Sequence, residues 1–266
     1  MKSIAMFGIC GRMGKAISGE LVKEGDIKLV AGFDSCNKGC DIGEVLGTGK
    51  TGISVTDSYD DVKKAAPDVI IDFTVAEAAQ KTISWAIHNS IDIIVGTTGI
   101  SRDVLEKYRK DSGKWDSKVF IVPNFAIGAV IMMKVSAMIA GYFESCEIIE
   151  LHHHRKQDAP SGTSLATAEG ISKNKVFSSS RLSAGEKENL EGSRGGFTGN
   201  IHIHSVRLPG LVAHQDVIFG TKGQTLSIRH DSTDRSSFYP GVIMAIRNIE
   251  KMGNFTYGLD KLIEFK

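Results

Sequence analysis

The first half of the chain alternates between short apolar runs and stretches with helical spacing. The runs are rich in β-branched residues and predict buried strands over residues 3–7, 27–33, 68–73, 91–95 and 118–122. The spacing between them predicts helices over residues 15–23, 56–65, 75–89 and 101–111. A glycine-rich loop is expected over residues 35–52. Alternating strands and helices favour a doubly wound parallel sheet of the α/β class.

From residue 126 the pattern changes and predicts an α+β domain. Helices are expected over residues 127–140 and 164–169, on either side of a strand over 146–151. The polar segment 178–199 predicts a loop, and three antiparallel strands follow over 201–207, 211–219 and 224–229. An amphipathic helix over 238–251 is expected to return to the first domain. The predicted division is therefore 1–124 plus 235–266 for one domain and 125–234 for the other.

Composition narrows the class of protein. The chain has 266 residues, a net charge of +1 and 41% hydrophobic residues, so nothing indicates a nucleic-acid partner. The longest apolar run, 125–142, is interrupted by Lys134 and indicates a core helix, so no membrane partner is expected. The four cysteines form no CxxC pair, and the N-terminal apolar run is too short for a signal peptide. These features favour reduced thiols and a cytoplasmic protein.

A glycine motif follows the first predicted strand. Gly8, Gly11 and Gly14 are spaced GxxGxxG, with Cys10 where a second glycine is more common. A glycine turn between a strand and a helix lets the backbone approach a pyrophosphate, and the helix N-terminus offsets its charge. Asp34 ends the second strand, twenty residues after Gly14, where an acid can bond a ribose hydroxyl. The alternative for Asp34 is a turn residue or a helix cap. Together the motif and the acid predict dinucleotide binding.

The residues after Asp34 bear on the choice of cofactor. No arginine follows this acid to accommodate a 2′-phosphate, although Lys38 could still reach one. We therefore expect NADH to be used at least as well as NADPH.

A second cluster occupies residues 150–163. His152 ends a predicted strand, and Lys156 lies four residues further on. Pro160 suits the first turn of the next helix, whose start would leave free the backbone N–H groups of residues 161–163. Such groups bind anions, and an imidazole can donate a proton near neutral pH. The cluster predicts a site for an anionic substrate that needs a proton.

Other histidines have plainer interpretations. His152 and His154 alternate along the predicted strand, so we expect them to share one face, with His153 on the other. If the strand is half exposed, His154 is favoured as a surface or core-packing residue. His202, His204 and His214 lie on predicted strands. An H-x-H pair can bind metal, but sheet-surface histidines are favoured here, and no metal site is predicted. Arg155 is expected to be a solvated or intersubunit charge, and Lys134 is left open between an inward anchor and a helix-end charge.

The chain resembles the 4-hydroxy-tetrahydrodipicolinate reductase (dihydrodipicolinate reductase) family in four motifs: the glycine motif 8–14, Gly96-Thr97-Thr98-Gly99, Pro123-Asn124-Phe125 and the segment 152–163. The resemblance runs from residue 4 to about residue 250 and is most specific in the segment His152-His153-xx-Lys156-x-Asp158-Ala159-Pro160-Ser161-Gly162-Thr163. It implies a Rossmann domain, a substrate-binding and oligomerisation domain, and usually a homotetramer built through the substrate-domain sheets. It further implies reduction of a cyclic imine dicarboxylate by NADH or NADPH in lysine and diaminopimelate biosynthesis.

The resemblance also implies roles for residues. His152 and Lys156 would supply protons, and His153, Gly162 and Thr163 would contact the substrate. The helix-start argument adds Ser161 to the substrate contacts. The cofactor would be lined by Gly8, Ile9, Cys10, Gly11, Arg12, Met13, Asp34, Gly96, Thr97, Thr98, Val122, Pro123, Asn124 and Phe125.

Three other functions stay open at this point. A zinc hydrolase could use His152 and His154 with the His202/His204 pair, provided that three ligands converge on one metal. A non-catalytic nucleotide sensor would leave the His/Lys cluster without a role. A different Rossmann reductase could act on another cyclic imine or dicarboxylate.

Overall fold

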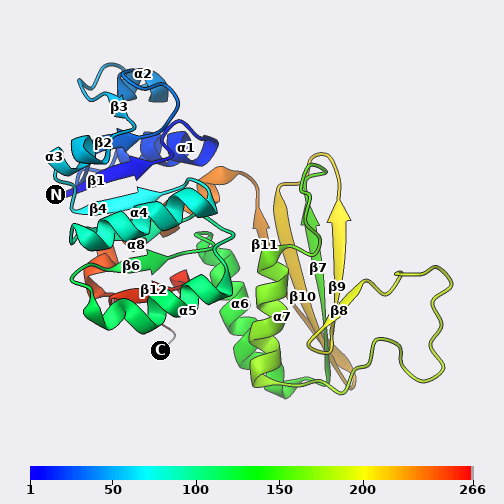
Figure 1. Cartoon of the computed structure of the whole chain (residues 1–266). Coiled ribbons are helices and arrows are strands. Elements are labelled where there is room, and N and C mark those ends of the chain that lie inside the picture. Colours follow the sequence, from blue (N-terminus) through cyan, green and yellow to red (C-terminus); the bar gives the residue numbers. More distant parts are fainter. Residues whose placement is uncertain (265–266) are drawn as a thin grey trace. The chain divides into compact units, whose positions relative to one another are not determined.

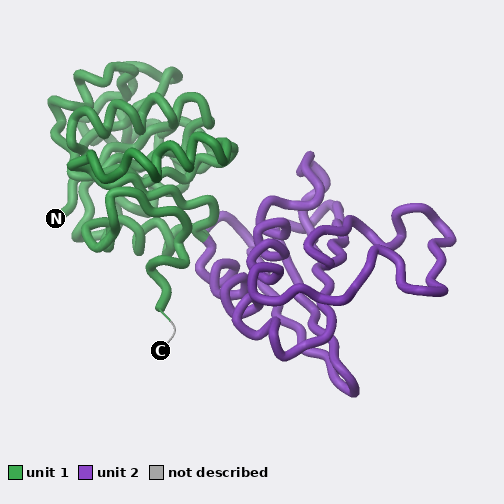
Figure 2. The backbone as a smooth tube through the Cα atoms, turned by 60° about the horizontal axis from the view of Figure 1, so that its bottom comes forward, with its two compact units in different colours: residues 1–125, 238–266 green, residues 126–237 purple. Residues whose placement is uncertain are grey.

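The computed structural model describes residues 1–264, and the chain forms two compact units. Unit 1 contains Met1–Phe125 and the chain from Phe238 onward, and unit 2 contains Ala126–Ser237 (Figure 2). The predicted divisions at residues 124 and 235 fall close to these two crossings. None of the helices within residues 1–264 combines the length and the apolar character that a bilayer span requires.

Unit 1 is built on a seven-stranded parallel sheet (Figure 1). Its order is β12-β6-β5-β4-β1-β2-β3, and every neighbouring pair is parallel. The strands are β1 (Lys2–Phe7), β2 (Ile27–Phe33), β3 (Val55–Thr56), β4 (Val69–Asp72), β5 (Asp92–Val95), β6 (Val119–Ile121) and β12 (Phe255–Tyr257). The strand order reverses between β1 and β4, and the crevice at the carboxyl ends of such strands is the usual ligand site in open α/β sheets. The doubly wound prediction is confirmed.

Helices surround this sheet because their apolar faces pack against its mostly apolar strands. They are α1 (Arg12–Leu21), α2 (Ile42–Leu46), α3 (Tyr59–Lys64), α4 (Ala76–His88), α5 (Arg102–Asp111) and α8 (Tyr239–Asn248). Ile83 of α4 packs into a core with Phe7, Ile70 and Val95 of the sheet, all of them fully buried. Across both units the chain also contains five short 3₁₀ helices: η1 (Ser112–Lys114), η2 (Ala140–Tyr142), η3 (Arg235–Phe238), η4 (Ile249–Lys251) and η5 (Leu259–Leu262).

Three predictions for unit 1 were wrong in detail. The glycine-rich segment 35–52 contains α2, because the Asp41 side chain caps that helix and Gly47 ends it in a left-handed conformation. The helix predicted over 56–65 starts only at Tyr59, because β3 comes first and Ser58 is the N-cap. The strand β12 at the sheet edge was missed altogether.

Unit 2 is a five-stranded sheet with two helices on one face (Figure 1). The order is β11-β10-β7-β9-β8. The strands are β7 (Ser145–His152), β8 (Gly196–Thr198), β9 (Ile201–Arg207), β10 (Ala213–Thr221) and β11 (Gln224–Ser232), and the helices are α6 (Ile127–Ile139) and α7 (Gly162–Asn174). Met132 of α6 and Ile171 of α7 pack in one core with Ile148, Val217 and Phe219 of the sheet. The α+β prediction is confirmed.

One pairing in unit 2 was not predicted, and one prediction was wrong. The central pair, β7 and β9, is parallel, whereas the other neighbours are antiparallel, including β10 and β11 as predicted. The predicted loop 178–199 contains β8, which pairs with β9 through Gly196–Thr198. Neither long-range pairing has a local sequence signal.

Candidate functional site

The glycine motif forms a tight turn at the carboxyl end of β1. Gly8 has φ 77°, and a Cβ there would lie 2.6 Å from the Phe73 carbonyl oxygen. A Cβ at Gly14 would lie 2.0 Å from the Gly8 carbonyl oxygen, so only glycine lets α1 start against this turn. Gly11 is the N-cap of α1. The chain therefore presents a helix N-terminus and bare backbone at the sheet's switch point, which fits a dinucleotide pyrophosphate.

Some residues of the glycine motif could contact a cofactor only through their backbone. Ile9 is fully buried in the core, so only its backbone could face a cofactor. The Cys10 N–H donates to Oδ2 of Asp34 at 2.9 Å, and the Cys36 N–H donates to Oδ1 at 2.9 Å. Asp34 thus joins the turn after β1 to the loop after β2. Arg12 is exposed and Met13 half-buried at the start of α1.

A buried carboxylate that the sequence analysis missed joins two further loops of unit 1. Asp72 ends β4 with no exposed surface. Its Oδ1 accepts hydrogen bonds from the Thr97 hydroxyl at 2.8 Å and from the Thr74 N–H at 2.9 Å. Its Oδ2 is buried and has no hydrogen-bond partner among the described residues. The loops after β4 and β5 are therefore fixed to one another at the edge where Gly8 lies.

The remaining predicted cofactor residues extend this edge. A Cβ at Gly96 would lie 2.2 Å from the Phe73 ring, and Thr98 beside the buried Thr97 is exposed. After β6, the Val122 N–H donates to the Val95 carbonyl oxygen at 2.8 Å. The predicted segment closes with exposed Pro123, half-buried Asn124 and Phe125, whose buried ring packs against Phe73. The turns after β1, β4, β5 and β6 thus line one edge of one sheet, as nicotinamide dinucleotide binding requires.

The second cluster lies at the carboxyl end of β7 in unit 2. His152 is the last residue of β7, and its side chain is 14% exposed. Its Nδ1 forms a very short hydrogen bond with Oε2 of Glu150, which has no exposed surface. The two side chains meet because residues i and i+2 of a strand share a face.

Glu150 is also held by a guanidinium from β9. Arg207 donates from Nη1 to Oε2 at 2.8 Å and from Nη2 to Oε1 at 2.7 Å. Burial raises the pKa of Glu150, but hydrogen bonds from His152, Arg207 and Ser205 outweigh it and lower the pKa to about 2. Glu150 is therefore an anion at neutral pH and can only accept hydrogen bonds, so the His152 proton lies on Nδ1 toward it.

Lys156 is fixed in the following turn. Its Nζ lies 2.8 Å and 2.9 Å from the two carboxylate oxygens of Asp158. This contact lowers the pKa of Asp158. The Asp158 backbone oxygen in turn accepts a hydrogen bond from Nη2 of Arg207 at 2.7 Å. Arg207 thus contacts both the residue that holds His152 and the residue that holds Lys156.

The start of α7 differs from the prediction in two respects. Pro160 lies before the N-cap Ser161 and not in the first helical turn. The Ser161 N–H is not free, because it donates to Oε1 of Glu150 at 3.3 Å. The Ser161 hydroxyl accepts the Ser164 N–H at 3.1 Å, as an N-cap does. Of the three residues predicted to offer amides there, Gly162 is exposed and Thr163 half-buried, whereas Ser161 is buried.

The other histidines have separate partners. β7 ends at His152, so the prediction that His154 shares its strand face was wrong, and His153 and His154 are exposed. Desolvation and the charge of Arg155 lower the pKa of His153. Partners of the strand histidines are Glu147 for His204, the Arg194 carbonyl for His202 and Asp231 for His214. Within residues 1–264, no three His, Cys, Asp or Glu side chains are grouped to hold a metal, which removes the basis of the zinc hydrolase hypothesis.

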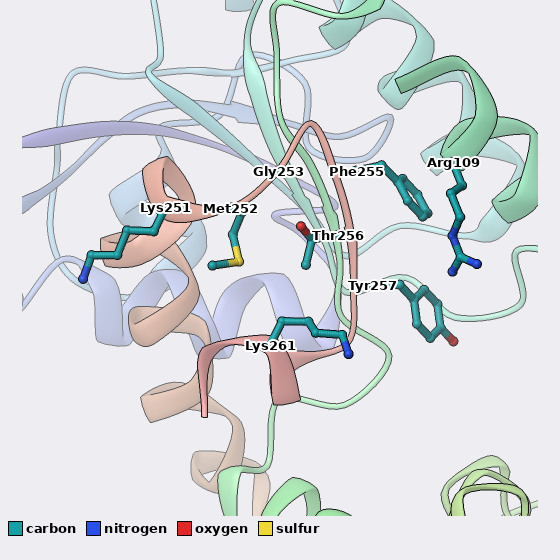
Figure 3. Close-up of a pocket in the computed structure, with 8 residues that line it drawn as sticks. All are labelled: Arg109, Lys251, Met252, Gly253, Phe255, Thr256, Tyr257 and Lys261. Carbon is teal, nitrogen blue, oxygen red and sulfur yellow. The ribbon is translucent and has the colours of Figure 1, made fainter. Parts of the chain in front are cut away.

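One cavity of unit 1 lies apart from all of these residues. It has a volume of about 380 Å³ and is lined by residues around β12, including Arg109, Lys251, Phe255, Tyr257 and Lys261 (Figure 3). None of the predicted site residues lines it. Three of its lining residues, Arg109, Lys251 and Lys261, are exposed cations.

Sequence reasoning missed Glu150, Arg207 and Asp72. Glu150 could have been found, because it lies two residues before His152 on a predicted strand. Arg207 is 57 residues away from Glu150 in the sequence, and no local pattern indicates that they meet.

Comparisons with known proteins match the chain along almost its full length. The family model described as dihydrodipicolinate reductase, N-terminus, matches residues 2–125, and that described as dihydrodipicolinate reductase, C-terminus, matches residues 128–263. A 4-hydroxy-tetrahydrodipicolinate reductase from Dictyoglomus turgidum is 44% identical over 264 residues, covering 99% of this chain and 98% of the relative. One from Carboxydothermus hydrogenoformans is 42% identical, covering 99% and 100%.

Solved structures agree with these relatives. A dipicolinate-bound dihydrodipicolinate reductase from Paenisporosarcina sp. TG-14 superposes with a TM-score of 0.86 at 35% identity, covering 99% of this chain and 100% of that one. An amine dehydrogenase from Mycobacterium smegmatis superposes with a TM-score of 0.66 at 11% identity, which shows a shared fold alone.

Proposed function

The chain belongs to the 4-hydroxy-tetrahydrodipicolinate reductase family of oxidoreductases, and from that premise we propose how its own residues carry out the reduction. The reaction is the NAD(P)H-dependent reduction of 4-hydroxy-tetrahydrodipicolinate to tetrahydrodipicolinate, with loss of the 4-hydroxyl group as water, in lysine and diaminopimelate biosynthesis. The observation that carries the proposal is the pairing of His152 with buried, anionic Glu150 beside the start of α7.

His152 is the proton donor in this proposal. A bound reduced nicotinamide supplies hydride to the substrate ring, and the negative charge left on the substrate must then be quenched by a proton. Nδ1 of His152 is held by Glu150, and Nε2 has no hydrogen-bond partner among the described residues, so Nε2 is the atom that gives the proton. The neighbouring anion stabilises the imidazolium from which this proton comes.

The substrate carboxylates are held by the turn after β7. The N–H groups of Gly162 and Thr163 lie in the first turn of α7, where anions are stabilised. Ser161 holds this turn as its N-cap, and exposed His153 is free to approach the substrate from the same segment. Lys156 breaks its contact with Asp158 when the substrate binds and contacts the substrate instead. It then polarises the imine or donates the second proton.

Unit 1 holds the cofactor through Gly8–Met13, Asp34, Gly96–Thr98 and the segment 122–125. Lys38, the cation that could have contacted a 2′-phosphate, instead lies 2.7 Å from Asp57. Both oxygens of Asp34 face backbone donors of the two loops that a ribose would approach. This arrangement favours NADH at least as much as NADPH, and a large preference for NADPH in steady-state kinetics would contradict it.

We also propose a homotetramer assembled through the unit 2 sheet. The helices cover the face that carries Ile148 and Val217. The opposite face carries Ile149, Leu151 and Ile218, all half-buried in the single chain. Such a face is suited to a second copy, and light scattering tests the assembly.

The direct test is a turnover assay on the purified full chain. Enzymatically generated 4-hydroxy-tetrahydrodipicolinate is added, and oxidation of NADH and of NADPH is followed by absorbance. Substrate-dependent oxidation supports the proposal. Tight NADH binding without turnover would favour a nucleotide sensor, and turnover only with another cyclic imine would favour a different reductase.

A further inference from the structure

We propose that Glu150 and Arg207 are the positioning residues of the proton-transfer site, acting on His152 and Lys156 without touching the substrate. The inference rests on the proposed function, because it takes His152 and Lys156 as the proton donors. It adds that Glu150 and Arg207 hold these two donors in place.

Glu150 acts on the tautomer and orientation of His152. A buried carboxylate that is anionic and only accepts hydrogen bonds places the imidazole proton on Nδ1. The same contact fixes the ring plane, so Nε2 points away from the strand end. In neutral imidazole Nε2 then accepts a proton, and in the imidazolium it donates one, both at a fixed position.

Arg207 makes this arrangement rigid. Its two terminal nitrogens bind both oxygens of Glu150, at 2.8 and 2.7 Å, which prevents rotation of the carboxylate. The third contact, from Nη2 to the Asp158 carbonyl oxygen, fixes the turn that carries Lys156. A single guanidinium therefore sets the positions of both proposed donors. The backbone supports the same geometry, because the Leu208 N–H donates to the His152 carbonyl oxygen at 3.1 Å.

The chain contains a matched control on the same strand. Glu147 also binds an arginine and a histidine, Arg194 at 2.6 Å and His204 at 2.8 Å. Residues 147 and 150 point to opposite faces of β7, so the Glu147 group lies away from the start of α7. Removal of the charge of Glu147 thus tests whether the loss of a Glu–Arg–His group elsewhere on this sheet also lowers turnover.

The experiment compares Glu150→Gln with Glu147→Gln in the full chain. We expect E150Q to lower kcat by about 10²–10³, the scale seen when a histidine loses its orienting anion. The KM for NADH should stay within about twofold, because unit 1 is unchanged. E147Q lies on the face proposed for assembly, so light scattering must first show that it keeps the wild-type oligomer. It should then change kcat by less than about threefold.

Equal losses of kcat in the two variants, or a wild-type kcat in E150Q, would overturn the proposal. If E150Q does not fold, Arg207→Lys is the alternative variant. It keeps the positive charge but loses the bidentate contact with Glu150, so kcat should fall while the KM for NADH is unchanged. If the wild-type chain has no reductase activity, the proposed function fails first. The positioning claim is then decided by ¹⁵N NMR of His152, which should show the Nδ1–H tautomer in the wild type and lose it in E150Q.

Discussion

Two glutamates of β7 each hold an arginine and a histidine, and only one of the two groups lies at a candidate active site. Glu150 binds Arg207 and His152, and Glu147 binds Arg194 and His204. The residue types are the same and both glutamates lie on β7, but His152 is on β7 and His204 on β9. The groups differ in place, because Glu150 shares the helix-covered face with Ile148 whereas Glu147 lies on the opposite face.

Burial separates the two groups further. The Glu150 side chain has no exposed surface, and that of Glu147 is 37% exposed. In both carboxyls burial raises the pKa and the hydrogen-bonding partners more than offset this, so the pKa of each is lowered, that of Glu150 to about 2. A Glu–Arg–His group is therefore not a catalytic motif by composition. We propose a role in catalysis only for the group that is buried at a strand end beside a helix start.

The largest expected difference between the two groups is the loss of kcat when each histidine is replaced. His152→Gln should reduce kcat by about 10²–10⁴ with little change in NADH affinity, the usual scale for a general acid. His204→Gln should reduce it less than about threefold. Steady-state kinetics of both variants checks this, and near-normal turnover in H152Q would reject His152 as the donor.

The two arginines should differ in their effect on folding. Arg207→Ala leaves the Glu150 charge buried without its partner and should lower the free energy of unfolding by about 3–5 kcal/mol. Arg194→Ala leaves a half-exposed carboxylate and should cost about 1 kcal/mol or less. Urea denaturation of each variant measures the difference, and equal losses would mean that burial does not separate the groups.

Lys156→Ala should produce a smaller kinetic effect than the loss of His152. We expect kcat to fall about 10–100-fold and the substrate KM to rise, because the ammonium both binds the substrate and polarises it. Lys173→Ala is the control, since that lysine pairs with Glu169 on the exposed side of α7. A Lys156→Ala variant with wild-type kcat and KM would remove Lys156 from the site.

The smallest effect concerns acid stability. The pKa of Glu150 is lowered from 4.5 to about 2, so its contribution to stability is complete above pH 4.5 and is lost as the pH falls through 2. The difference in unfolding free energy between wild type and E150Q should therefore shrink over this range. E147Q should show a weaker trend. Denaturation at several pH values tests this, and a pH-independent difference for E150Q would contradict it.

The sequence predicted those parts of the fold and site that have local signals. The parallel strands of unit 1 are apolar runs, and the glycine turn at Gly8 lies between a strand and a helix, so both could be inferred directly. His152 and Lys156 were found because they are close in the sequence. The roles given to these residues remain predictions until the variants are measured.

What was missed depends on contacts between distant segments. β12 is three residues long and forms only by pairing with β6, and β7 pairs in parallel with β9 across a long connection. Arg207 reaches Glu150 through that pairing. Asp72 looked like an ordinary strand end, and only the fold places Thr97 beside it. Cross-strand partners of this kind have no sequence period that could indicate them.

The most direct test of the central claim, that Glu150 acts through His152, is the kcat of the double variant E150Q/H152Q. If Glu150 only positions His152, the double variant should have the kcat of H152Q alone, because there is no imidazole left to orient. If the two losses multiply, Glu150 acts on the reaction independently of His152, and the account given for this strand end is contradicted.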